Sequence, residues 1–158
     1  MHERTKKGAC VVATTCSALL VSALCFEILE FVPCAMCMWQ RWAHVVAAVL
    51  ASATMLSSRS RTSMPEWLMR ATAMALATGG AIAVYHAGVE WKWWEGPATC
   101  TVGVAATTGD VLMHIARAPM SRCDQAAWRL AGVSMAGYNA VISLALAWFA
   151  WTTSIRRP

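Results

Sequence analysis

Two cysteines in the segment Pro33-Cys34-Ala35-Met36-Cys37 are separated by two residues. A Cys-x-x-Cys of this kind suits thiol–disulfide exchange, in which one thiolate attacks a disulfide and another thiolate leaves. A purely structural disulfide at this spacing would close so small a loop that it would add little stability. We therefore interpret Cys34 and Cys37 as a redox pair.

The residues that follow can lower the pKa of these thiols. If a helix begins near Cys37, the unpaired amide groups of its first turn favour a negatively charged sulfur. Arg41 lies four residues after Cys37 and seven after Cys34, which places its guanidinium on the same helical face as the thiols. His44 continues this face one turn deeper. Arg41 and His44 are therefore candidate residues for binding a cofactor beside the thiols.

Arg41 lies at the outer edge of an apolar segment, and the preference of basic residues for the cytoplasmic side of a membrane does not explain this position. Ionisable groups near membrane depth are by default paired or functional, so we favour a functional role over that of a snorkelling anchor. Glu27 and Glu30, in the last turn of the preceding apolar segment, could pair with Arg41. We expect these two carboxylates instead to reach water at the headgroups.

The composition of the chain indicates whether these residues lie in water or in a membrane. Hydrophobic residues make up 58% of the 158 residues and charged residues only 13%, against roughly 25% charged residues in an average soluble domain. The net charge of +5 does not indicate a nucleic-acid partner, because the basic residues lie at the ends of apolar runs and not on a solvated face with stacking aromatics. The chain is therefore expected to lie in lipid.

Four apolar segments are long enough to cross a hydrocarbon core of about 30 Å as helices. They cover about 9–31, 38–57, 71–89 and 130–153. The first is too long for the apolar stretch of a secretory signal, so we expect an uncleaved helix. The polar stretch 59–70 contains Pro65 and predicts a turn or a short surface helix. We expect an all-α membrane protein, a single four-helix transmembrane bundle over 1–158.

The basic residues predict its orientation, because lysine and arginine concentrate in the short segments that stay in the cytoplasm. They cluster in the two terminal segments and in 59–70, as Arg4, Lys6, Lys7, Arg59, Arg61, Arg70, Arg156 and Arg157. Both termini are therefore expected in the cytoplasm. The turn 31–38 and the long loop 90–129 then face outward, and in that loop Asp110 could cap a short surface helix over 111–116.

The topology divides the seven cysteines into two sets. Three fall in the first apolar segment, where a thiol packs as a small apolar side chain: Cys10, Cys16 and Cys25. Four fall in the segments expected to face an oxidising compartment: Cys34, Cys37, Cys100 and Cys123. Four cysteines allow three pairings, and the residues alone do not choose among them.

Zinc binding is the alternative use of these four thiols. A structural zinc site usually draws its ligands from two close-spaced pairs, whereas twenty-two residues separate Cys100 from Cys123. His114, in the expected surface helix, is interpreted as an interfacial side chain and not as a ligand. We therefore expect redox exchange and no metal.

Three motifs taken together resemble the disulfide bond formation protein B (DsbB) family of bacterial inner-membrane enzymes. The first is Pro33-Cys34-Ala35-Met36-Cys37-Met38-Trp39-Gln40-Arg41. The second is Tyr85-His86, followed by a tryptophan-rich stretch and Ala98-Thr99-Cys100; the third is Arg122-Cys123-Asp124 with Trp128 and Met135 beyond. The resemblance covers nearly the whole chain, and it rests on the order and topological side of these motifs.

The resemblance implies a relay that reoxidises a periplasmic DsbA-type thiol oxidase with a membrane quinone, either ubiquinone or menaquinone. The reduced oxidase would attack Cys100, and Cys123 would then exchange with Cys34. Cys37, as a thiolate, would engage the quinone ring, with Arg41 stabilising the charge or binding a quinone oxygen. His86 would border the quinone pocket.

Two departures from the family leave the type of member open. The spacing between Cys100 and Cys123 is slightly shorter than the best-known members would suggest, and the first segment carries three extra cysteines. Two other functions compete with the relay. One is reversed flow of reducing power outward through Cys10, Cys16 and Cys25, and the other is a membrane scaffold or metal-binding module with structural cysteines.

Overall fold

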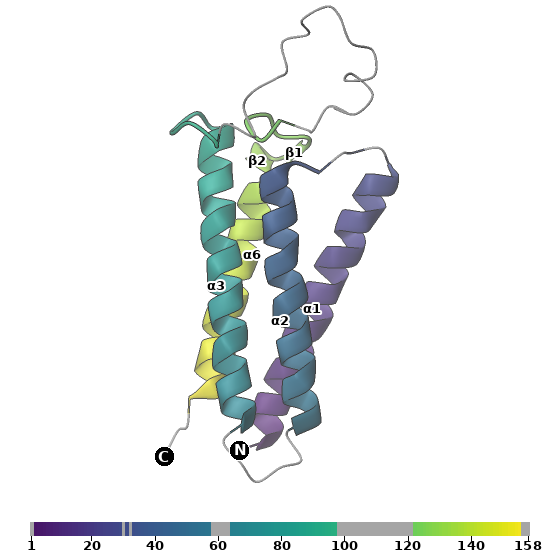
Figure 1. Cartoon of the computed structure of the whole chain (residues 1–158), viewed down its shortest axis with the longest axis vertical. Helices are drawn as coiled ribbons and strands as arrows, with labels where there is room; N and C mark the ends of the chain where they lie inside the picture. Colours follow the sequence, from purple (N-terminus) through teal and green to yellow (C-terminus); the bar gives the residue numbers. More distant parts are fainter. Residues whose placement is uncertain (1, 30, 32, 58–63, 98–121, 156–158) are drawn as a thin grey trace, which may run out of the picture.

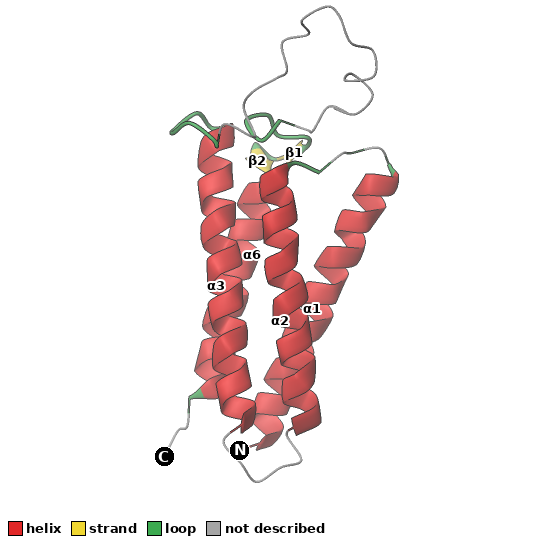
Figure 2. Ribbon diagram, in the orientation of Figure 1, coloured by secondary structure: helices red, strands yellow, loops and turns green. Residues whose placement is uncertain are grey.

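The computed structural model describes residues 2–29, 31, 33–57, 64–97 and 122–155. It contains four helices over these ranges, α1 His2–Ile28, α2 Ala35–Ser57, α3 Met64–Glu90 and α6 Met135–Ser154. Two short strands, β1 Arg129–Leu130 and β2 Val133–Ser134, lie at one end of the bundle (Figure 1). The helices run along a common axis, and the start of α1 and the end of α6 lie at the end away from the strands (Figure 2).

Helix α3 packs along both α2 and α6, while α1 packs mainly against α2. The close approach of α3 depends on two glycines, because a Cβ on Gly79 would lie 2.7 Å from the Cβ of Ala43, and one on Gly80 would lie 2.8 Å from a methyl group of Leu144. Small residues allow helix backbones to approach in this way in membrane proteins. Towards the strands, α1 diverges from α2 (Figure 1).

The main core lies nearer the other end of the bundle, where α1 begins and α6 ends. Its buried side chains are mostly small: Ala9, Val12, Cys16, Ala47, Ala51, Met69, Ala73, Leu76, Ala147 and Ala150. Cys16 therefore packs in the core as expected, but Cys10 and Cys25 are exposed on α1. For Cys10 and Cys25, the expectation that a thiol behaves as a small apolar side chain in lipid stays a prediction.

The outer faces of the bundle are apolar, with large exposed side chains such as Val21, Val49, Met74 and Val141 on the four helices. Two helices, Glu3–Ile28 and Pro65–Glu90, are long and apolar enough to cross a membrane by length and composition. Polar residues reduce the apolar character of the other two, among them Gln40 and His44 on α2 and Asn139 on α6.

Two expected segment boundaries were wrong. Pro65 is not in a separate turn or surface helix but in the first turn of α3, where its missing N–H costs no hydrogen bond. The last helix begins at Met135 and not near residue 130, because Arg129 pairs with Ser134 and Leu130 with Val133 in a tight hairpin. Ser134 then caps α6, since its hydroxyl accepts a hydrogen bond from the Gly137 amide at 3.2 Å.

Several predictions fall outside the described residues. These are the surface helix over 111–116 with His114, the position of Cys100 and the surroundings of Glu30. The described part of the outer segment includes 90–97 and 122–134, which lie at the end of the bundle that carries the Cys-x-x-Cys (Figure 1).

Candidate functional site

Cys34 caps the amino terminus of α2. Its carbonyl accepts the Met38 amide at 3.1 Å, and its Sγ accepts the Cys37 amide at 3.2 Å. The helix thus begins two residues earlier than the expected start near Cys37, and an unpaired amide of its first turn donates to the Cys34 sulfur. This is the interaction between helix amides and sulfur that the sequence predicted, made by Cys34 as the capping residue.

The two sulfurs of the motif lie 2.7 Å apart, so a small shift would close a disulfide bond of about 2.05 Å. Both thiols lie outward of the predicted span 38–57. The hydrogen bond between them lowers the pKa of Cys37 and raises the pKa of Cys34, and burial raises the pKa of Cys34 further. Arg41 also lowers the pKa of Cys37, but less than the Cys34 contact does. Of the two thiols, Cys37 is therefore the one that more readily becomes a thiolate.

Cys123 lies directly beside Cys34, although 88 residues separate them in the sequence. Its Sγ, the Cys34 Sγ and one ring nitrogen of His86 all lie within 4.8 Å of one another. Both cysteines are buried, with exposed fractions of 1% for Cys123 and 3% for Cys34. Cys123 is disulfide-bonded, whereas the other five cysteines in the described ranges are free thiols. The three atoms could ligate a soft metal only after reduction of Cys123, because the thiolate is the ligand form.

His86 and Glu90 lie one turn apart near the outer end of α3, and both side chains are buried. The Nε2 atom of His86 lies 3.6 Å from the Cys34 sulfur and 3.7 Å from Oε1 of Glu90. The family resemblance implied that His86 borders a quinone pocket; the contact of His86 with the Cys34 sulfur was not predicted. Glu90 was not predicted, although a carboxylate at the end of an apolar helix was visible in the sequence.

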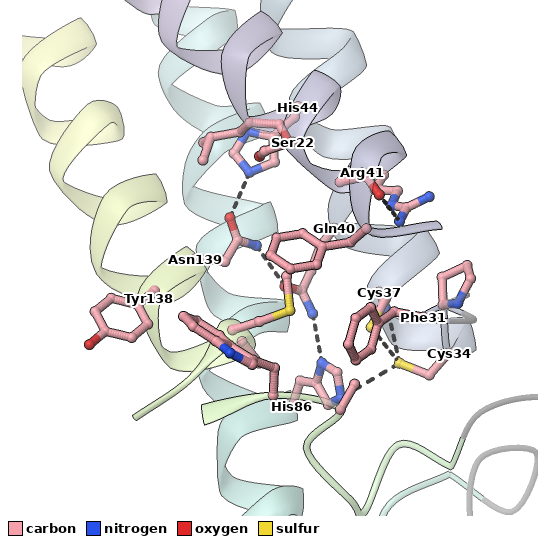
Figure 3. Close-up of a pocket in the computed structure, with 18 of the residues that line it drawn as sticks. Ser22, Phe31, Cys34, Cys37, Gln40, Arg41, His44, His86, Tyr138 and Asn139 are labelled. Carbon is pink, nitrogen blue, oxygen red and sulfur yellow. Dashed lines mark hydrogen bonds between the residues drawn. The ribbon is translucent and has the colours of Figure 1, made fainter. Parts of the chain in front are cut away.

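A chain of polar side chains, buried except for the half-buried Asn139, leads from His86 into the bundle (Figure 3). Gln40 and His44 from α2 meet Asn139 and Ser143 from α6 through hydrogen bonds of 2.6 to 3.4 Å. Of these four residues, the sequence pointed only to His44. A signal for the others was present, since each pair is spaced i, i+4 in an otherwise apolar helix, which places both members on one face.

Arg41 does not follow the buried face of α2 but turns towards α1. Its Nη1 lies 2.8 Å from Oε1 of Glu27, and its Nη2 donates to the Ala23 carbonyl at 3.2 Å. The expectation that Glu27 reaches headgroup water was therefore wrong. The reason is the arrangement of α1, which brings this carboxylate against α2 where a paired charge is more stable than two separate ones.

A cavity of about 360 Å³ opens beside these groups, between α1, α2 and α6 and below the hairpin. Its walls are mostly apolar and include Phe26, Phe31 and Trp128. Cys37, Arg41 and His44 contribute polar atoms to it. Cavities of this size, with apolar walls and a few convergent polar groups, are typical of sites for small molecules and cofactors.

An apolar helical bundle that holds a Cys-x-x-Cys against a disulfide-bonded cysteine defines a membrane thiol–disulfide oxidoreductase. The model of the family "Disulfide bond formation protein DsbB" matches residues 5–153, and the chain belongs to this family. It is therefore a disulfide-generating membrane oxidase. No curated protein and no solved structure matches the chain.

Proposed function

We propose that the chain passes electrons from a periplasmic DsbA-type thiol oxidase to a membrane quinone, ubiquinone or menaquinone. The observation that carries this proposal is the position of Cys34, whose sulfur lies between the Cys123 sulfur on one side and Cys37, which lines the cavity, on the other. This arrangement offers an entry for electrons from protein and an exit beside a small-molecule site.

The first transfer runs through Cys123. Reduction of its disulfide by the partner oxidase, with attack at Cys100, frees Cys123 as a thiolate. That thiolate attacks Cys34 in a Cys34–Cys37 disulfide, so that the Cys34–Cys123 bond forms and the Cys34–Cys37 bond breaks. The electron pair leaves on Cys37, whose thiolate the positive charge of Arg41 favours. The sulfurs need little movement, because they lie within 4.8 Å.

The cavity fits a quinone head group. Its aromatic walls can pack on a flat ring, and Arg41 places a positive charge at its edge to balance the Cys37 thiolate. His44 contributes a buried ring nitrogen, Nδ1, that has no hydrogen-bond partner within the described residues. A bound quinone would supply the two-electron acceptor chemistry. The protein would hold the ring and keep the thiolate dry.

The proposed orientation places both termini in the cytoplasm and the cysteines at the periplasmic face of the inner membrane. The basic residues of the sequence support it. The site lies at the opposite end of the bundle from the start of α1 and the end of α6 (Figure 1), which agrees with a site on the other side of the membrane from the termini.

The test uses purified full-length protein, a reduced thioredoxin-fold oxidase and a soluble quinone. We expect quinone reduction by the native chain and none by Cys37→Ser. Cys25→Ser is the matched control, because Cys25 is exposed on α1 and takes no part in the site. Full quinone reduction by Cys37→Ser would contradict the mechanism. Loss of activity on replacing Cys10, Cys16 and Cys25 together with alanine would instead favour the reversed flow of electrons.

A further inference from the structure

The buried polar chain has a single hydrogen-bond direction. It runs from His44 through Asn139 and Gln40 to His86, and from there to Cys34 (Figure 3). The side chains come from α2, α3 and α6, so their alignment is a property of the folded bundle. All three residues of this chain on α2 and α3, Gln40, His44 and His86, are buried.

The amide groups set the direction because an amide nitrogen can only donate and an amide oxygen can only accept. Gln40 donates through Nε2 to Nδ1 of His86 at 2.9 Å. Nδ1 must therefore carry no proton, and in the neutral ring the proton sits on Nε2. That N–H faces the Cys34 sulfur at 3.6 Å and a carboxylate oxygen of Glu90 at 3.7 Å, both acceptors. The backbone of Cys123 also accepts a hydrogen bond from the His86 ring, on the same side as the exchanging sulfurs.

The other end of the chain supports the same direction. Asn139 donates through Nδ2 to Oε1 of Gln40 at 2.6 Å, so its Oδ1 faces His44 as an acceptor, at 2.8 Å from Nε2. His44 therefore carries its proton on Nε2 and leaves Nδ1 as a bare acceptor. This is the buried atom without a partner in the described chain. With both amides reversed, that atom would instead be a buried and unpaired N–H donor.

We propose that Gln40 and Asn139 are positioning residues that fix the Nε2–H tautomer of His86, so that His86 donates a hydrogen bond to the Cys34 sulfur during exchange with Cys123. This inference rests on the proposed relay and adds residues to it. The second nitrogen of a histidine commonly sets which nitrogen is protonated, and here that role falls to an amide.

The donor acts at the step that resolves the Cys34–Cys123 disulfide. An incoming thiolate attacks Cys123, a new sulfur–sulfur bond forms there, and the Cys34–Cys123 bond breaks. The electron pair of that bond leaves on Cys34. The Nε2–H of His86 and the Cys37 amide, at 3.2 Å, both point at this sulfur and stabilise its negative charge. The opposite tautomer would direct a lone pair at the leaving thiolate.

The test combines nitrogen NMR of ¹⁵N-histidine-labelled full-length protein with exchange kinetics. We expect His86 in the native chain to be the Nε2–H tautomer alone. Gln40→Met keeps the length of the side chain but removes the amide, so we expect both tautomers of His86. We also expect resolution of the Cys34–Cys123 disulfide to slow about tenfold, the effect of one hydrogen bond to a charged atom. Acid quenching, alkylation and mass analysis would follow this step.

Thr54→Val is the matched control, because Thr54 is buried on the same helix α2 and its hydroxyl bonds the Leu50 carbonyl of that helix, away from the amides and His86. It should leave the His86 tautomer and the exchange rate unchanged. An Nδ1–H tautomer in the native chain would overturn the inference, and this measurement does not depend on any variant folding. An unchanged exchange rate in Gln40→Met would also overturn it. A native chain with the expected tautomer but no quinone reduction would instead contradict the proposed function.

Discussion

Replacement of Asp124 by asparagine should slow the exchange between Cys123 and Cys34. Asp124 follows Cys123 directly and binds two cations. Its Oδ2 lies 2.7 Å from Nζ of Lys92, and Arg122 contacts both carboxylate oxygens at 2.9 Å. Lys92 lies just beyond α3, the helix that carries His86. The ion pair with Lys92 therefore ties the Cys123 segment to the outer end of α3 and keeps its sulfur beside Cys34.

The size of the effect follows from the charge interactions. The hydrogen bonds from Arg122 and Lys92 lower the pKa of Asp124 from its ordinary value of 3.8 to about 2, which corresponds to about 2.5 kcal/mol. Water reaches the two cations, whose side chains are 48% and 64% exposed, so screening reduces the net contribution to about 1 kcal/mol. Asp124→Asn should then slow the exchange about fivefold.

The pH dependence has a defined sign. Because the folded-state pKa of Asp124 is depressed, its contribution to stability is complete above pH 3.8 and is lost as the pH falls through about 2. The ratio of the exchange rates of Asp124→Asn and the native chain should therefore be constant between pH 5 and pH 8, a range that lies well above both pKa values.

The assay is single-turnover exchange, followed by acid quenching and alkylation after reduction of the Cys123 disulfide. Glu95→Gln is the control, since it removes the same charge from the same outer end of the bundle, and Glu95 makes no ion pair in the described part of the chain. Equal slowing by Glu95→Gln would mean that the general field, and not the bridge to Lys92, controls the rate. An unchanged rate in Asp124→Asn would refute the reasoning.

Three further results are expected. Arg41→Met should weaken quinone affinity and also destabilise the bundle by about 1 to 3 kcal/mol, because it leaves Glu27 partly buried and unpaired. Adding Glu27→Gln to this variant should restore most of the stability but not the quinone affinity. Recovery of both would mean that Arg41 serves only as an anchor. In the reduced protein, iodoacetamide should modify Cys37 at lower pH than Cys34, because the pKa of Cys37 is lowered and that of Cys34 is raised. Peptide mapping across a pH series measures this order, and the reverse order would contradict the prediction. Gly79→Ala should lower the unfolding temperature, because overpacking against Ala43 costs about 1 to 3 kcal/mol. Adding Ala43→Gly should restore the unfolding temperature. No effect of Gly79→Ala alone would mean that the two helices lie further apart than described.

The residues themselves predicted the local parts of this protein. Apolar runs long enough to span a membrane predicted helices, because hydrogen bonding in lipid leaves the backbone few alternatives. The Cys-x-x-Cys and the i, i+4 position of Arg41 predicted a redox motif at a helix start, because both patterns depend only on residues close together in the sequence. The family resemblance implied that His86 borders a quinone pocket, whereas its contact with the Cys34 sulfur was visible only in the structure.

Only the tertiary structure decided which groups meet. Cys123 lies against Cys34 and Asn139 bonds to Gln40, although the members of these pairs are 89 and 99 positions apart in the sequence. Arg41 and Glu27 pair because α1 packs on α2, which no local pattern specifies. The start of α6 at Met135 depends on a hairpin that closes through the left-handed residues Ala131 and Gly132. Such contacts depend on how whole helices are arranged, and a hydrogen-bond chain through three helices acquires its direction only when all of them are packed.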